Sequence, residues 1–243
     1  MLTWLHKLGS PPLLYRFAKR VAPWLLALAV VLTVIGLIGG LWLAPPDARQ
    51  GDGFRIMYVH VPSAILSMVV FAVMAISSAV GLIWRLRMAH AVTAAAAPIG
   101  AAFAFLALVT GSLWGKPMWG TYWVWGARLT SELVLLFLYF GYIALTNAFS
   151  ERKTGDKAGA ILALVGAVDL PIIHYSVVWW TTLHQGASLK LSGATIQPMM
   201  LWPLLVMIGA FLCYFGWLLM VRLRVEILHR ERRARWIERL ALE

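Results

Sequence analysis

The chain is poor in charged residues, and in acidic ones above all. Only 13% of its 243 residues are Asp, Glu, Lys or Arg, whereas about 25% is usual for soluble domains. Apolar residues make up 61% of the chain, and the mean hydropathy is +0.79. This composition excludes an ordinary soluble domain and predicts an integral membrane protein.

Cysteine is almost missing, and several common motifs are missing altogether. The single cysteine, Cys213, excludes an intramolecular disulfide, and no Cys-x-x-Cys-His stretch is present to which haem could be attached covalently. The sequence also contains no P-loop, no internal repeat and no low-complexity linker. We therefore expect one domain over residues 1–243.

The scarcity of acidic residues leaves a strong positive charge. There are 21 Lys and Arg against 10 Asp and Glu, which gives a formal net charge of +11. Such a charge could indicate nucleic-acid binding. However, the basic residues occur in short segments that flank apolar runs, a pattern that suits anionic lipid headgroups. We predict contact with the lipid bilayer and no nucleic-acid partner.

Six apolar runs are long enough to cross a bilayer, which takes about 20 helical residues. Backbone polar groups in lipid have to be paired within the segment, so each run should be a helix. The sequence thus predicts an all-α fold, a bundle of six transmembrane helices. The first run is too long for the core of a signal peptide and should remain as an anchor. The predicted spans cover residues 21–43, 62–84, 91–113, 129–148, 158–178 and 199–221.

Basic residues concentrate on one side of these spans. Because Lys and Arg favour the cytoplasmic side, both termini should be cytoplasmic. The basic tail, residues 222–243, should extend the sixth helix along anionic lipid, the alternative being a docking helix for a partner. The cytoplasmic basic residues are Lys7, Arg16, Lys19, Arg20, Arg85, Arg87, Arg152, Lys153, Lys157 and the arginines of the tail. The other side receives residues 44–61, 114–128 and 179–198, whose basic residues are Arg49, Arg55, Lys116, Arg128 and Lys190.

The second outer segment is rich in tryptophan. Four of the thirteen tryptophans of the chain, Trp114, Trp119, Trp123 and Trp125, fall within it. An interfacial aromatic belt would contribute only about one or two residues at each helix end. Large flat rings favour stacking with a flat apolar ligand, so the segment is suited to a porphyrin. Gly115 would let the backbone approach such a ligand closely.

Two histidines, His60 and His184, are predicted on this outer side, in two separate segments. Proline is favoured at the first position of a helix, so Pro62 should begin the second span and His60 should lie just before it. His184 follows the fifth span. Each histidine alone could be an interfacial polar residue, but together two neutral imidazoles suit the axial positions of a haem iron. Zinc is a weaker interpretation, because these segments offer few Cys, Asp or Glu ligands.

Haem propionates would need cations, and three of the outer basic residues are candidates, Arg128, Arg55 and Lys116. Arg128 and Arg55 are favoured over Lys116, because the planar guanidinium matches a carboxylate. Arg128 could equally pair with Glu132 one helical turn away.

The fifth span contains two polar residues in an apolar run. Asp169, followed by Pro171, indicates a kink that holds one satisfied acid, with a proton or substrate pathway as the alternative. His174 is expected to be a buried hydrogen-bonding residue, with a role as a third iron ligand as the alternative.

The motifs together resemble a known family. Residues 114–133 read Trp-Gly-Lys-Pro-Met-Trp-Gly-Thr-Tyr-Trp-Val-Trp-Gly-Ala-Arg-Leu-Thr-Ser-Glu-Leu and are similar to the "WWD" segment of haem-handling proteins. With Tyr-Val-His-Val-Pro at residues 58–62 and Leu-His-Gln-Gly at residues 183–186, the chain resembles the CcmC family of the cytochrome c maturation system. The similarity extends over most of the chain.

This resemblance implies a bacterial inner-membrane protein that presents haem b at its periplasmic face and helps to load it onto the chaperone CcmE. It implies CcmA, CcmB and CcmD as partners, and iron ligation by His60 and His184 against the four tryptophans. The chain departs from the motif in one place, since Gly126 stands where the family has Asp. That departure bears on transfer to the chaperone more than on haem binding.

We therefore predict a haem-binding and haem-delivering membrane protein rather than an enzyme. Two alternatives stay open. A transporter that moves haem through the bundle would need polar residues in several spans, and a haem lyase would need a docking site for apocytochrome c.

Overall fold

The computed structural model describes residues 9–184, 189–190 and 193–240, and the regular elements among them are helices and one small hairpin. The predictions for Lys7, Gln185 and Gly186 lie outside the described residues. The hairpin pairs β1 (Leu189–Lys190) with β2 (Gly193–Ala194). The helices are α2 (Pro11–Ile38), α3 (Met57–Ile83), α4 (Arg87–Trp119), α5 (Ala127–Asn147), α6 (Arg152–Gly166), α7 (Asp169–Trp179), α8 (Pro198–Arg230) and α9 (Arg235–Leu240), with short helical turns η1 (Gly39–Leu43) and η2 (Asp52–Ile56).

Six helical segments are long and apolar enough to cross a membrane, as predicted. The protein is therefore an all-α, multi-pass membrane protein. The helices are longer than the predicted spans. The first begins ten residues earlier, at Pro11, and the last continues to Arg230, into the predicted basic tail. The fifth span consists of two helices, α6 and α7.

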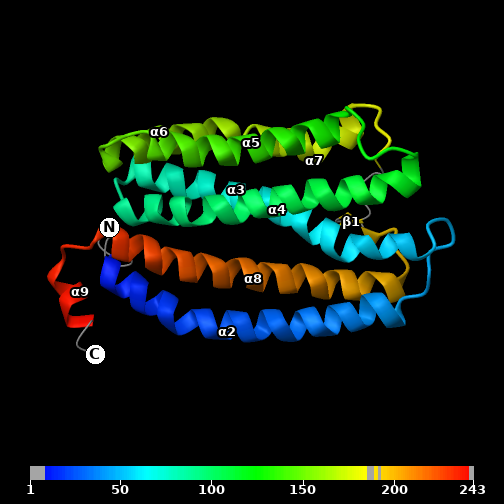
Figure 1. Ribbon diagram of the computed structural model, residues 1–243, viewed down its shortest axis with the longest axis horizontal. Helices are drawn as coiled ribbons and strands as arrows, with labels where there is room; N and C mark the ends of the chain where they lie inside the picture. Colours follow the sequence, from blue (N-terminus) through cyan, green and yellow to red (C-terminus); the bar gives the residue numbers. More distant parts are fainter. Residues whose placement is uncertain (1–8, 185–188, 191–192, 241–243) are drawn as a thin grey trace.

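The spans form two layers (Figure 1). α2 and α8 lie side by side along their lengths, and α3 to α7 make up the second layer. The centre of the second layer is a buried cluster around Leu66, Phe71 and Tyr139. The Tyr139 hydroxyl donates to the carbonyl of Ser67 at 2.6 Å, so the one polar atom of this large buried ring is paired. This pairing fixes α5 against α3.

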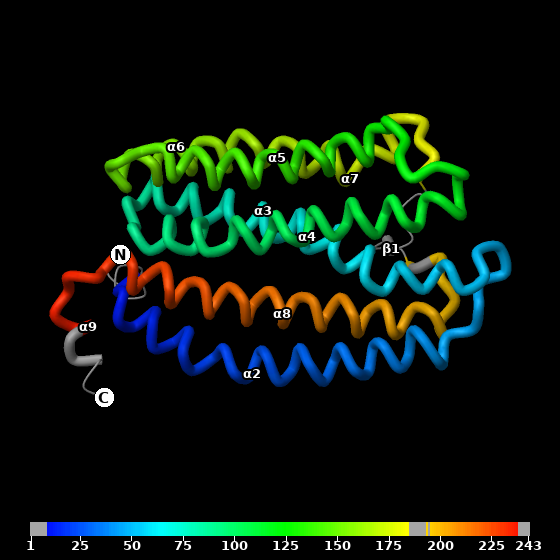
Figure 2. The backbone as a smooth tube through the Cα atoms, viewed as in Figure 1, coloured from blue at the N-terminus to red at the C-terminus, as the bar shows by residue number. Residues whose placement is uncertain are grey.

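The basic and the tryptophan-rich segments lie at opposite ends of the bundle (Figure 2). The start of α2, the α3–α4 turn, the start of α6 and the end of α8 share one end, while residues 120–126 and 180–184 share the other. Because the number of spans is even, the start of the first span and the end of the last lie at the same end of the bundle. That the basic end faces the cytoplasm stays a prediction from the charge distribution.

The predicted interruption of the fifth span is present, although its acid is not satisfied as expected. The helix breaks at residues 167–168, so that Asp169 begins α7 and Pro171 lies in the first turn of α7, where its missing N–H costs nothing. Asp169 is only 9% exposed, and among the described residues its Oδ2 has no hydrogen-bond partner. The prediction of a satisfied acid is therefore wrong.

A cluster of ionic contacts lies at the basic end of the bundle. The guanidinium of Arg230, on α8, donates to both carboxylate oxygens of Asp156 at 2.7 and 2.8 Å and to Glu226 at 2.7 Å. Arg152 donates to the same oxygen of Glu226. The cluster joins α6 to α8 across the two layers. Beyond it, Trp236 of α9 packs against Tyr15 of α2 with ring centroids 5.9 Å apart.

Candidate functional site

A cavity of about 330 Å³ opens at the tryptophan-rich end, between α3, α4, α5, α7 and the first turns of α8. Small-molecule sites in proteins fall in the range of about 300–1,000 Å³. Most of the lining is apolar or aromatic, and the polar side chains are few. Those polar side chains are His60, Arg128, Glu132, His174 and His184.

The tryptophan segment is only partly a loop. The prediction of a loop over residues 114–128 is wrong for the first six of them, because α4 continues to Trp119. The helix ends at Gly120, whose φ of +77° lies in the left-handed region that glycine adopts without strain. Helical spacing of three and four residues then turns one face of α4 to the cavity, and that face carries Gly111, Trp114, Gly115, Met118 and Trp119.

His60 lies inside α3, not before its start. The prediction that Pro62 begins this helix is wrong, because η2 leads directly into α3 at Met57. His60 is half-buried, and its Nδ1 is 3.0 Å from the carbonyl oxygen of Ala107 on α4. A carbonyl can only accept, so Nδ1 donates the proton and Nε2 keeps the lone pair. That tautomer is the one that binds a metal through Nε2.

The surroundings of His60 fix its ring. Thr110 Oγ1 lies 3.1 Å from the same nitrogen, and the ring of Trp114 meets the imidazole edge to face at 5.6 Å. Trp114 is held in turn from the outer segment, since its Nε1 donates to Oε1 of Gln50 at 2.8 Å. The first histidine is therefore positioned by α4 and by the segment that precedes α3.

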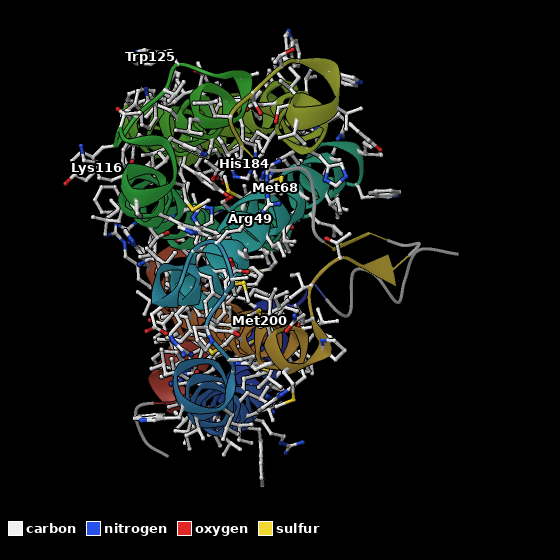
Figure 3. The ribbon with its side chains drawn as sticks, turned by 90° about the vertical axis from the view of Figure 1, so that its right-hand side faces the viewer. Arg49, Met68, Lys116, Trp125, His184 and Met200 are labelled. Carbon is white, nitrogen blue, oxygen red and sulfur yellow. The ribbon has the colours of Figure 1, made fainter. Side chains whose placement is uncertain are left out.

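His184 reaches the same cavity from the segment after α7. Figure 3 looks along the bundle from the tryptophan-rich end and shows His184 over the middle of the bundle, in line with Met68 of α3. Its ring lies 6.1 Å from that of Trp119. The structure thus brings His60, His184, Trp114 and Trp119 to one cavity, each histidine beside one tryptophan.

Arg128 also lines the cavity, together with Glu132 one turn further along α5. The guanidinium donates to the carbonyl of Ile173 on α7 at 2.8 Å. Within the described residues no ion pair joins Arg128 to Glu132, so their predicted pairing is absent. Glu132 is 7% exposed, and its Oε1 has no hydrogen-bond partner among the described residues.

Three predicted site residues do not line the cavity. Arg55 turns toward η1, where it donates to the carbonyl of Gly40 at 2.5 Å and pairs with Asp52 at 2.9 Å. Trp123 and Trp125 follow the end of α4 and contact each other edge to face at 5.3 Å. Trp125 is 75% exposed and lies at the periphery in Figure 3, as does Lys116.

His174 does not occupy the predicted environment. The sequence predicted a buried, hydrogen-bonding His174. In the structure its side chain is exposed on α7, and its ring meets that of Tyr175 edge to face with centroids 4.7 Å apart. It lines the cavity. The prediction of a buried His174 is therefore wrong.

Gly126 has an identifiable place in the fold. It is the residue before the first turn of α5, with φ −94° and ψ +161°, and the N–H of Thr130 donates to its carbonyl at 3.0 Å. Asp, Asn, Ser and Thr are preferred at this N-cap position, and glycine is tolerated there. A Cβ at Gly126 would have as its nearest neighbour Thr182 Cβ at 4.0 Å, so an aspartate would fit.

Comparison with known proteins agrees with this architecture. The family model described as heme exporter protein C, CcmC, matches residues 4–238. The chain belongs to this family. The CcmC resemblance read from the sequence is thereby confirmed.

Individual members of the CcmC family match over nearly the whole chain. The chain is 51% identical to "Heme exporter protein C" of Haemophilus influenzae, over 99% of this chain and 98% of the relative. It is 52% identical to the protein of the same name from Escherichia coli K12, over 98% and 97%. A "Putative cytochrome c biosynthesis ccmC-like mitochondrial protein" of Marchantia polymorpha is 39% identical, over 86% and 89%.

Sequence reasoning missed Gly111 and Met118 as lining residues and assigned Glu132 only a pairing role. A signal for them was present. Counting three and four residues from Trp114 and Trp119 reaches Gly111, Gly115 and Met118, and the same step from Arg128 reaches Glu132. The signal was hidden because the helix was expected to end before the tryptophans.

Proposed function

We propose that the cavity binds haem b as cargo, with His60 and His184 as the two axial ligands of the iron. The observation that carries this proposal is the contact of His60 Nδ1 with the carbonyl of Ala107 at 3.0 Å. It supports a neutral imidazole with its Nε2 lone pair available for a metal. A histidine that served only as a polar residue at the interface would not require this tautomer.

The lining residues fit a porphyrin. Trp114 and Trp119 offer flat rings beside each histidine, and apolar side chains of α3 and α4 make up most of the remaining wall. Arg128 is the cation of the cavity wall and would take a propionate. Arg55 was an equal candidate from the sequence, but its contacts with Gly40 and Asp52 support a structural role for it.

We further propose that the protein delivers this haem at the periplasmic face of the bacterial inner membrane to the chaperone CcmE. The relatives named heme exporter protein C and the relative named for cytochrome c biosynthesis support this role. CcmA, CcmB and CcmD would be its partners, and both termini would face the cytoplasm. The exposed ring of Trp125 and its neighbour Trp123 lie outside the cavity, where a docking chaperone could reach them.

Haem content and delivery test the proposal. The protein purified in detergent should retain haem, and added apo-CcmE should receive it. We expect Trp125→Ala to keep its haem and to load CcmE more slowly, whereas Trp119→Ala should lose haem. A wild-type protein that neither copurifies with haem nor binds added haem would overturn the binding proposal. Equal loading by wild type and Trp125→Ala would overturn the role given to the exposed ring.

A further inference from the structure

Glu132 is a buried acid in the wall of the cavity, and the proposed iron ligation gives it no role. Its side chain is 7% exposed, and Oε1 has no hydrogen-bond partner among the described residues. It shares the cavity with both histidines and with Arg128. Leaving a carboxyl group buried and under-bonded is costly, so its retention in a cavity suggests that something entering the cavity compensates it.

The nearby cation of α5 forms no ion pair with this carboxyl group, and Oε1 stays unpaired among the described residues. Arg128 is one turn away but directs a guanidinium nitrogen to the carbonyl of Ile173 at 2.8 Å, and no ion pair links it to Glu132 within the described residues. A ligand that itself carries positive charge inside the cavity would compensate the carboxyl group further.

Iron changes charge with its oxidation state while the rest of haem does not. Ferric iron in a dianionic porphyrin with two neutral imidazoles carries a net positive charge at its centre, and ferrous iron carries none. A carboxylate in the same low-dielectric cavity attracts the ferric centre and gains nothing from the ferrous one. Burial and charge near the iron are among the main means by which proteins set its potential.

We infer that Glu132 is a counter-charge that favours the ferric state of the bound haem. The inference rests on the proposed haem binding and assigns to Glu132 no contact with the iron. Glu132 acts on the iron through the electric field of its carboxylate. The cavity would therefore hold ferric haem more tightly than ferrous haem.

The test is a potentiometric titration of the haem-loaded protein with dithionite as the electron donor, on wild type, Glu132→Gln and Glu132→Asp. Glu132→Gln keeps the size of the side chain and removes the charge, so we expect its midpoint potential to be higher. The ratio of ferric to ferrous affinity should fall about tenfold, which is about 59 mV for a one-electron couple. Glu132→Asp keeps the charge and should stay close to wild type. Asp169→Asn is the matched control, since Asp169 is a buried acid of the same bundle that does not line the cavity.

Each outcome decides the inference. A midpoint potential of Glu132→Gln equal to that of wild type overturns it, and so does an equal rise in Asp169→Asn. If Glu132→Gln loses its haem during purification, ferric haem and dithionite-reduced haem are each titrated into the haem-free variant. A ratio of ferric to ferrous affinity equal to that of wild type overturns the inference. Failure of the proposed function looks different, because wild type itself would then bind no haem in either state.

Discussion

Gly111 of α4 faces the imidazole of His60 so closely that no side chain fits between them. A Cβ at Gly111 would lie 2.9 Å from Cε1 of His60, a distance at which one of the two has to move. The same imidazole is tied to the Ala107 carbonyl, one turn before Gly111. The glycine therefore maintains the position of the proposed ligand.

This relationship predicts the effect of Gly111→Ala. We expect the imidazole to be displaced and haem affinity to fall by about tenfold or more, since misplaced ligands are costly to catalytic and binding sites alike. Fold stability should not fall in parallel, because alanine is the better helix former by about 1 kcal/mol. Titration of haem into the purified protein measures the affinity.

Gly141→Ala is the matched control for this variant. Gly141 also lies within a transmembrane helix, but its Cβ would meet Leu162 at 3.6 Å, an ordinary contact. We expect haem affinity as in wild type. An identical loss in both variants would contradict the role of Gly111.

Gln50 is expected to act on the cavity through Trp114. Gln50→Ala removes the acceptor of the indole N–H, which should cost about 1 kcal/mol of stability and weaken haem binding. Gln50→Glu keeps an oxygen acceptor and should bind haem almost as wild type does. Thermal unfolding and haem titration of the two variants provide the comparison. Equal behaviour of Ala and Glu would show that the hydrogen bond at 2.8 Å has no influence on the site.

The N-cap position of Gly126 predicts a small effect for the residue that the family motif has there. Gly126→Asp should raise the stability of α5 by only a few tenths of a kcal/mol, because glycine is already tolerated as an N-cap. Gly126→Ala should lower it by about 1 kcal/mol. Thermal unfolding measures both changes. If Gly126→Asp instead loads CcmE markedly faster than wild type at equal stability, the aspartate acts on the chaperone and not on the helix.

The ionic cluster at the basic end should determine stability without affecting the cavity. Arg230→Gln removes the cation that pairs with Asp156 and leaves Glu226 paired with Arg152 alone, and the side chains of Asp156 and Glu226 are 14% and 17% exposed. Breaking a buried pair costs about 3–5 kcal/mol. We expect a clear drop in the thermal midpoint in detergent and unchanged haem affinity.

Arg87→Gln is the control for the cluster. Arg87 is 77% exposed in its pair with Glu231, and exposed pairs contribute about 1 kcal/mol or less. A similar drop for both variants would contradict the importance of burial at Arg230.

The sequence predicted the fold well because apolar length alone specifies a transmembrane helix. It was less successful at the ends of the helices. Trp119 and Arg230 both lie beyond their predicted spans, since tryptophan and arginine are tolerated in the helical turns that leave the hydrocarbon core. Pro62 was misread because η2 already supplies the helical turn before α3.

The candidate site was predicted in part. His60, His184, Trp114, Trp119 and Arg128 do line one cavity. The structural role of Arg55 could not be predicted, because it donates to a backbone carbonyl of η1, and a sequence pattern of side chains does not reveal such an acceptor. Glu132 could not be recognised as a buried acid with an unpaired oxygen, because its burial depends on how the neighbouring helices pack around it.

The central claim is that His60 and His184 bind the iron of one haem in this cavity. Absorption spectra of haem-loaded wild type, His60→Ala, His184→Ala and His174→Ala test it most directly. His174→Ala is the control, because His174 lines the same cavity and is assigned no bond to iron. We expect the spectrum of His174→Ala to match wild type, and those of His60→Ala and His184→Ala each to shift as one axial ligand is lost, with partial return when free imidazole is added. Unchanged spectra in both His60→Ala and His184→Ala, or a shift only in His174→Ala, would contradict the claim.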